Sequence, residues 1–240
     1  MSYRVKNAFI PLIFIAGFIL LIFFSCKKNS TEPIAIDESY FPLVTGKYII
    51  YDVDSQGWNS FFDTTDTDYY RNSHYQIMEE VDSQYIDNTG NTAFKIIRSR
   101  RENESSPWMI TDIWSANLTD HTAEKVEENL RFIKLDFPAL LNRQWYGNSK
   151  IQTDSNLSFL AGWKYEYSSV DQPLTLNGHS FDSTVSVTQF VDSNVIQQYI
   201  YREKFAKHVG MIYKYEDSLS TQPNKPWNGR IVTMNVKDFN

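Results

Sequence analysis

Several residue types that commonly build catalytic or cross-linked sites are scarce in this chain. Its 240 residues include one cysteine, Cys26, so no disulfide can form within it. The four histidines, His74, His121, His179 and His208, lack the close spacing of a zinc motif. The sequence also has no phosphate-binding loop, dinucleotide fingerprint, His-Glu-x-x-His or Gly-x-Ser-x-Gly motif. These absences disfavour the common motif-bearing hydrolases and nucleotide enzymes, and we predict no cofactor.

The first 26 residues have the order of a secretory signal peptide that ends in a lipid-attachment motif. Two basic residues precede a long apolar run, and Ser25 and Cys26 end it. A small residue directly before a cysteine is what a lipoprotein signal peptidase requires. We therefore predict a signal peptide over 1–25 and acylation of Cys26 with fatty acyl chains such as palmitate. The alternative is that residues 7–25 remain as a transmembrane anchor, since 19 mostly apolar residues can just span a bilayer.

The residues after Cys26 predict how the chain is attached and where it lies. Residues 26–38 are mostly polar and contain Pro33, which is typical of a flexible tether. Lys27 and Lys28 stand where an inner-membrane retention signal would have an Asp, and no acidic surface-export run follows. We expect a lipid anchor in the outer membrane and a domain that faces the periplasm.

The charge of the mature chain limits its partners. Removal of the signal peptide leaves 21 Lys and Arg against 29 Asp and Glu, a net charge of −8. This balance argues against nucleic acid and against peripheral binding to anionic lipid. The predicted contact with the membrane is therefore through the N-terminal lipid.

Short alternating segments rich in Tyr, Ile, Val and Phe predict an all-β fold that is mainly antiparallel. It is a sandwich or an open or half barrel with at most one or two short helices. Turn signals at 87–90 and at Asn177-Gly178 separate several segments. The predicted strands are 47–53, 58–62, 74–81, 92–98, 108–115, 163–170, 183–191 and 195–204.

The sequence also predicts one turn, one segment that fits either secondary structure, and a single domain. Residues 54–57, Asp-Ser-Gln-Gly, are predicted to form the turn of a hairpin. Residues 122–133 fit either a helix or strands. We expect a single β domain over 39–240. A faint repeat of Phe-Pro and apolar positions leaves open two similar halves, 39–115 and 137–240.

Three stretches, 40–48 (YFPLVTGKY), 124–135 (EKVEENLRFIKL) and 206–214 (AKHVGMIYK), resemble uncharacterised lipoproteins of Bacteroidota-type bacteria. The resemblance also includes the Phe-rich segment before Ser25-Cys26. It implies a location in the cell envelope and a β architecture. It implies no activity, cofactor or catalytic residue.

One segment resembles the start of a calcium loop. Asp52, Asp54 and Gln56 alternate before a glycine, and Asp63 stands at the twelfth position. A hard cation needs oxygen ligands of this kind, but Gln replaces an acid and the flanks have strand character. An ordinary hairpin tip is the favoured interpretation, so we predict no metal and keep these four residues as a weak calcium candidate.

Three Asp-Ser or Asp-Thr sites fit a short acceptor motif for periplasmic O-glycosylation: Thr64, Ser183 and Ser218. Ordinary turn chemistry is the alternative for the same dipeptides. Two carboxylate pairs, Glu79-Glu80 and Glu127-Glu128, bear on hydrolysis of glycans. Neighbouring residues of a strand point to opposite faces, so neither pair is expected to form a glycosidase site by itself.

Aromatic residues are abundant in the mature chain, with 31 in 215 residues including six tryptophans. Most are expected in the β core, and the rest can line a face for a sugar or a lipid. We therefore predict a non-catalytic binding or accessory module of the envelope. Its partner is a lipid, a glycan or an envelope protein. The alternatives are a glycan-active hydrolase with acids from separate strands and a structural subunit of an envelope complex.

Overall fold

The computed structural model describes residues 36–240 except 63 and 155, and these residues belong to one compact unit. They form twelve antiparallel strands in a single sheet and two 3₁₀ turns, η1 (Glu38–Tyr40) and η2 (Ser158–Leu160). The all-β prediction is confirmed. The strands are β1 (Tyr48–Trp58), β2 (Tyr70–Ile86), β3 (Thr92–Arg101), β4 (Met109–Leu118), β5 (Thr122–Glu127), β6 (Leu130–Asp136), β7 (Gln144–Tyr146), β8 (Lys164–Leu176), β9 (His179–Ser193), β10 (Gln197–Ala206), β11 (Gly210–Ser220) and β12 (Asn228–Phe239).

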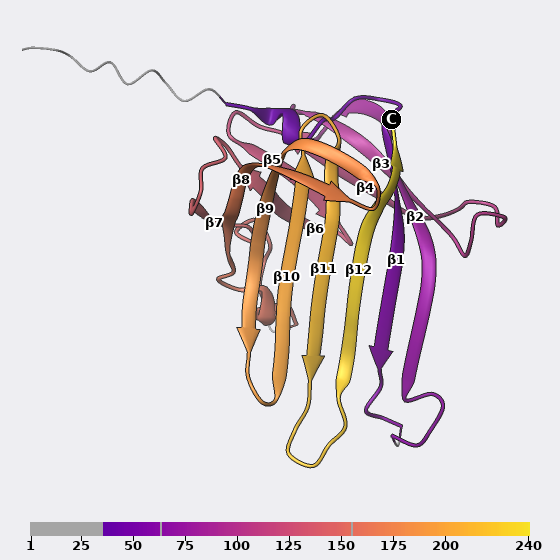
Figure 1. Cartoon of the computed structure of the whole chain (residues 1–240). Coiled ribbons are helices and arrows are strands. Elements are labelled where there is room, and N and C mark those ends of the chain that lie inside the picture. The colour runs from indigo at the N-terminus through magenta and orange to yellow at the C-terminus, as the bar shows by residue number, and fades with distance from the viewer. Residues whose placement is uncertain (1–35, 63, 155) are drawn as a thin grey trace, which may run out of the picture. The chain divides into compact units, whose positions relative to one another are not determined.

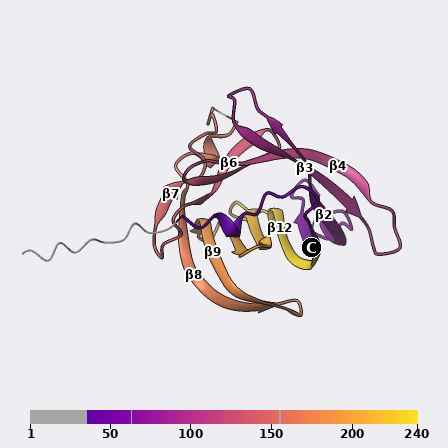
Figure 2. The same ribbon diagram turned by 90° about the horizontal axis from the view of Figure 1, so that it is seen from above.

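The strand order makes the sheet nearly closed. Each strand pairs with its neighbours along the chain except that β6 and β7 do not pair, and β1 also pairs with β12, so the order is β6-β5-β4-β3-β2-β1-β12-β11-β10-β9-β8-β7 (Figure 1). The two edge strands, β6 and β7, are consecutive and meet through two bonds. The Ile133 N–H donates to the Gly147 carbonyl (2.8 Å), and the Trp145 indole N–H donates to the Ile133 carbonyl (2.9 Å). Seen from above, the strands curl around a common interior (Figure 2). The open barrel, and not the sandwich, is the correct alternative.

The predicted strands are found at their expected places, mostly longer than predicted, but the first hairpin is wrong. Residues 54–57 lie inside β1, where they pair with β12 on one side and β2 on the other. Pairing on both sides satisfies the backbone of this segment and overrides its turn composition. The chain reverses only after Trp58, so 58–62 is not a second strand.

Residues 122–133 form strands, not a helix. Glu128 (φ 49°) and Asn129 (φ 64°) connect β5 to β6 in a tight turn. The turn Asn177-Gly178 (φ 51° and 86°) is confirmed between β8 and β9. The segment between the two predicted halves is therefore part of the sheet, because β5 and β6 continue it from β4.

The segment that leads into β1, residues 36–47, crosses one end of the sheet, and we call it the N-terminal strap. Tyr40 and Phe41 are buried in the main core. The Tyr40 hydroxyl bonds with Asp171 (2.6 Å) and Ser183 (2.7 Å). Lys47 donates to the carbonyl of Asn240, the residue after β12. The strap thus lies at the end of the sheet where β12 ends.

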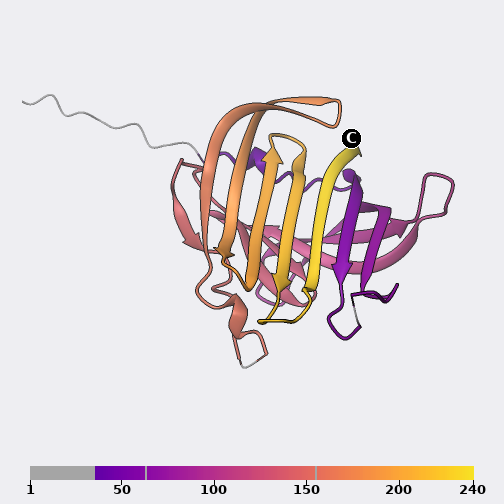
Figure 3. The same cartoon turned by 60° about the horizontal axis from the view of Figure 1, so that its bottom comes forward.

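The hairpin of β8 and β9 bends over the outside of the sheet at this same end (Figure 3). The Asn177 amide donates to the Val236 carbonyl (3.0 Å), and Phe181 packs against Phe239. A second small core forms there, centred on Phe181, Ile212 and Val236. Among the described residues, no helix is both long and apolar enough to cross a membrane.

Candidate functional site

The interior of the sheet is lined partly by charged side chains, which is unusual for a β core. Lys125 and Glu127 alternate on β5, and Lys214 and Glu216 alternate on β11. Alternate residues of a strand share a face, so each pair points the same way. Glu127 and Lys214 approach to 4.0 Å although β5 and β11 are not neighbours in the sheet. These side chains therefore meet across the interior.

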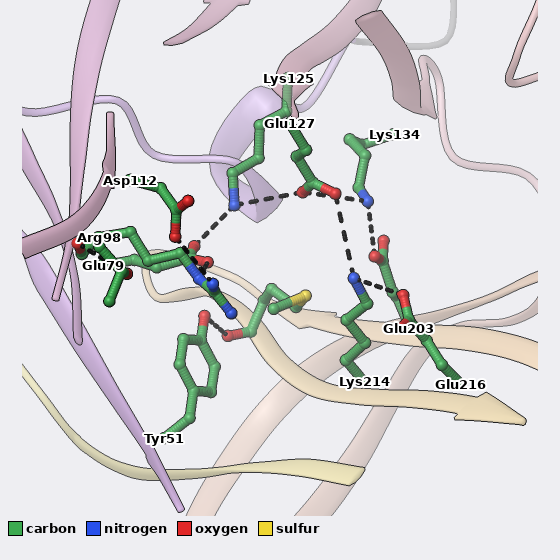
Figure 4. Close-up of polar contacts among 12 residues, drawn as sticks. Tyr51, Glu79, Arg98, Asp112, Lys125, Glu127, Lys134, Glu203, Lys214 and Glu216 are labelled. Atoms are coloured by element: carbon green, nitrogen blue, oxygen red, sulfur yellow. Dashed lines mark hydrogen bonds and ion pairs between the residues drawn. The ribbon is translucent and has the colours of Figure 1, made fainter. Parts of the chain in front are cut away.

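Ten charged residues from eight strands form one continuous series of ion pairs, which we call the interior network; all of them except Arg230 are labelled in Figure 4. Five are acids and five are bases, so their formal charges cancel. Its members are Glu79, Arg98, Asp112, Lys125, Glu127, Lys134, Glu203, Lys214, Glu216 and Arg230.

Glu127 lies at the centre of the network. Its carboxylate is 3.4 Å from Lys125, 3.5 Å from Lys134 and 4.0 Å from Lys214. Burial alone would raise the pKa of Glu127, but the three ammonium groups outweigh it and hold this pKa well below its ordinary value. Glu127 is therefore an anion at neutral pH.

The deepest pair joins Lys134 and Glu203 at 2.6 Å, with side-chain exposures of 4% and 0%. Burial alone would lower the pKa of Lys134, but Glu127 and Glu203 outweigh it and raise that pKa. The second carboxylate oxygen of Glu203 has no hydrogen-bond partner among the described residues. Lys134 thus supplies the hydrogen bond that this carboxylate accepts.

The other end of the network is built around Arg98. Its guanidinium lies 3.1 Å from Asp112 and 3.7 Å from Glu79, and Glu79 accepts a 2.6 Å bond from Lys125. The Arg98 guanidinium also lies 4.7 Å from the centre of the Trp114 ring, which is a cation–π contact. These contacts fix the orientation of Trp114 beside the network.

Two buried tyrosines lie next to the network. The Tyr51 hydroxyl donates to the Met211 carbonyl (2.9 Å), and the Tyr165 hydroxyl donates to Asn148 (2.9 Å). Burial, together with nearby glutamates, raises the pKa of both tyrosines well above the ordinary value. Both hydroxyls are therefore protonated donors.

A cleft of about 420 Å³ opens beside the network. Its volume lies within the range of small-ligand sites, about 300–1,000 Å³. Three acids, three bases, three aromatic residues and three aliphatic residues line it. They are Glu127, Glu128, Glu216, Arg98, Lys214, Arg230, Tyr75, Trp114, Phe132, Leu130, Val232 and Met234.

A smaller cavity of about 70 Å³ lies under the N-terminal strap. Phe41, Pro42 and Leu43 of the strap cover it, and Glu79 and Lys125 reach it from the network. The network thus extends from this covered cavity to the open cleft. Water-sized space remains at both of its ends.

The calcium candidate does not form a loop. Asp52, Asp54 and Gln56 lie on the outer face of β1, where Asp52 accepts from Gln76 (2.7 Å) and Asp54 contacts His74. Asp63 lies outside the described residues. In the part of the chain that the structure describes, no group of three or more His, Cys, Asp or Glu is arranged to hold a metal ion.

The modification candidates differ in their surroundings. Thr64 is exposed in the connection between β1 and β2. Ser183 lies in β9 and donates to Asp171 (2.8 Å), while Ser218 lies in β11 and donates to the Arg230 carbonyl (3.2 Å). Cys26 lies outside the described residues. An enzyme would reach Thr64 without disturbing a strand.

The paired carboxylates contribute more than the sequence predicted. Glu79 belongs to the network, and Glu127 and Glu128 both line the cleft. Glu127 and Glu128 were expected to point to opposite faces of a strand, and this expectation is wrong. Glu128 lies in the turn after β5 and not in the strand, so both side chains can line the same cleft. The sequence did carry a signal for the network: Lys125-x-Glu127 and Lys214-x-Glu216 place opposite charges on one face of a strand.

The tryptophans are divided between core and cleft. Trp145 and Trp163 are buried in the main core, where Trp163 stacks on Phe190 with ring centres 4.5 Å apart. Trp114 packs against the same core from a partly buried position and also lines the cleft. Of these three rings, Trp114 is therefore the one placed to contact a ligand in the cleft.

No protein-family model matches this chain, and no curated protein matches its sequence. The fold is similar to two solved structures. One is described as an exported protein of Bacteroides fragilis with a YmcC-like fold (9% identity, TM-score 0.46, covering 83% of this chain and 98% of that one). The other is described as a lipoprotein of Parabacteroides distasonis (8% identity, TM-score 0.44, covering 84% of this chain and 98% of that one). Neither description states a ligand, a substrate or a partner, so the site has to be judged from its own residues.

Proposed function

We propose that this chain is a lipoprotein of the bacterial cell envelope, anchored in the outer membrane through acylated Cys26 and facing the periplasm. Within that setting it acts as a non-catalytic binding module. The observation that carries this function is the preformed cleft, in which charged and aromatic side chains from separate strands converge. The predicted signal peptide and the Ser25-Cys26 motif support the location.

A glycan hydrolase is the competing function, because the cleft brings carboxylates together beside a tryptophan. Glu127 and Glu216 both contact Lys214, at 4.0 Å and 2.7 Å. A glycosidase needs one of its two acids to be protonated so that it can donate to the leaving group. Burial alone would raise the pKa of Glu216, but Lys214 outweighs it and lowers that pKa, as happens for Glu127. Both acids are anions, which favours binding over hydrolysis.

An accessory subunit of an envelope complex is a second candidate, and a specific surface favours it. On β4, Met109, Ile110 and Ile113 are each more than 60% exposed. Exposed aliphatic side chains gathered within one strand are typical of surfaces that contact another protein. Ligand binding in the cleft and partner binding on β4 use different residues, so they can be tested separately.

The direct test is native mass spectrometry of the full-length chain purified from an envelope that contains its natural ligands. Val232 lines the cleft from β12, and Val232→Trp fills it. The neighbouring Ile231 points to the other face of the same strand, so Ile231→Trp is the matched control. We expect a bound mass in the wild type and in the control but not in Val232→Trp. A bare wild-type chain would overturn the binding function.

A further inference from the structure

The charge balance of the cleft indicates the class of its ligand, an inference that rests on the proposed binding function. Glu127, Glu128 and Glu216 line the cleft together with Arg98, Lys214 and Arg230, so the formal charges of the lining sum to zero. We propose that the ligand is a net-neutral, hydroxyl-rich saccharide and that the cleft rejects acidic glycans, cationic ligands and lipid chains.

A charged ligand would have to compete with partners that are already in place. Lys214 bridges Glu216 (2.7 Å) and Glu127 (4.0 Å), so an added anion must displace a carboxylate to reach it. An added cation must displace Lys214 itself. A ligand with net charge therefore leaves one charge of the cleft unpaired, which is costly away from bulk water.

An apolar ligand is disfavoured for a different reason. Lys214 and Glu216 have side-chain exposures of 16% and 20%, so each retains some contact with solvent. A lipid chain in the cleft would remove that solvent and supply no hydrogen bonds in return. Hydroxyl groups can replace the water, because each one both donates to a carboxylate and accepts from an ammonium or guanidinium.

The apolar residues of the lining suit the other surface of a sugar ring, and two of them lie beside the charged pair, since Val232 pairs with Glu216 and Met234 with Lys214 across β11 and β12. Leu130, Phe132, Val232 and Met234 present aliphatic and aromatic groups, against which the C–H face of a sugar packs. Trp114 is held in position by Arg98. The lining thus offers charged and apolar groups side by side, matching a ring that has hydroxyl edges and C–H faces.

The test measures binding to full-length protein in a detergent without a sugar headgroup, since an alkyl glycoside would compete. The probes are neutral hexose and N-acetylhexosamine oligosaccharides, the corresponding uronic-acid oligosaccharides, and phosphatidylethanolamine vesicles. Isothermal titration calorimetry provides the readout, because the chain has six tryptophans and both variants add another. We expect saturable binding of a neutral oligosaccharide, loss of that binding in Val232→Trp, and retention in Ile231→Trp.

A second variant changes the charge of the cleft without changing its shape. Glu216→Gln leaves Lys214 and Arg230 with one carboxylate fewer, so the lining gains a net positive charge. We expect the ratio of acidic to neutral binding to rise by at least about tenfold, as expected when one charge-assisted contact changes. A variant that merely loosens the fold would weaken both classes of ligand equally.

The outcomes separate the ligand class from the binding function. Preference of the wild type for uronic-acid oligosaccharides or vesicles, or neutral binding that survives in Val232→Trp, overturns the saccharide proposal. A different bound mass in native spectra leaves the binding function standing and removes only the proposed ligand class. Failure of every probe together with a bare chain in the native spectra overturns both.

Discussion

Replacing Lys134 by methionine isolates the energetic role of the interior network. Lys134 lies 2.6 Å from Glu203 and 3.5 Å from Glu127, and both Lys134 and Glu203 are almost fully buried. With an effective dielectric constant of about 20, these distances correspond to attractions of about 6 and about 5 kcal/mol. Desolvation of the two ions, which costs several kcal/mol for each, offsets much of this attraction in the wild type.

The substitution removes the attraction but leaves Glu203 buried. We therefore expect Lys134→Met to lower the free energy of unfolding by about 3–5 kcal/mol, the usual cost of leaving one member of a buried pair unpartnered. The double variant Lys134→Met/Glu203→Leu removes both ions and should recover most of that loss. Lys95→Met is the matched control. The Lys95 ammonium lies 2.7 Å from Asp82, but this pair is partly exposed and should contribute less than about 1 kcal/mol.

Urea unfolding followed by tryptophan fluorescence measures all three variants on one scale. A loss of less than about 1 kcal/mol in Lys134→Met would refute the argument. A double variant no more stable than the single one would refute it equally, since the cost would then come from lost packing and not from an unpaired charge.

Three further predictions concern pH, modification and attachment. Glu127 and Glu216 have lowered pKa values, and hydrogen bonds lower the pKa of Asp171 to about 2. The stabilisation of the fold by these three ionised carboxylates is therefore complete above about pH 4.5 and is lost as the pH falls toward 2. Unfolding midpoints measured at pH 2–7 should drop across that window. Among the three glycosylation candidates, we expect occupancy at Thr64 but not at Ser183 or Ser218, and intact masses of native wild type and Thr64→Ala that agree apart from the side-chain difference would contradict this. The intact mass of the wild type should start at Cys26 and include acyl chains, whereas Cys26→Ser should lack acyl chains and keep residues 1–25, because the signal peptidase requires the cysteine; a wild-type mass that retains residues 1–25 without acyl chains would favour the transmembrane alternative.

The fold could be predicted further from the sequence than the site could. Alternating segments and Asn177-Gly178 located most strands, because the side-chain period and positive φ are local properties. The error at 54–57 arose because one of its strand partners, β12, lies far away along the chain. Closure through Ile133 and Gly147 likewise depends on contacts that local patterns do not encode.

The candidate site was harder to predict because its residues come from eight strands. Sequence identified Glu79 and Glu127 as acids of interest but gave no reason to join them to Lys134 or Lys214. Their meeting depends on the curl of the sheet, which brings β5 and β6 across from β10 and β11. The calcium candidate failed to form a loop for the same kind of reason, since Asp52 and Asp54 are fixed by strand pairing.

The position of the strap relative to the cleft bears on how an anchored protein would meet its ligand. The described chain enters at residue 36, and the strap contacts Asn240 at the end of β12. Arg230 and Val232, near the start of the same strand, line the cleft. Nine residues of extended strand between Arg230 and Phe239 span about 30 Å. The cleft therefore extends toward the end of the sheet opposite the strap, and no residue of the strap lines it.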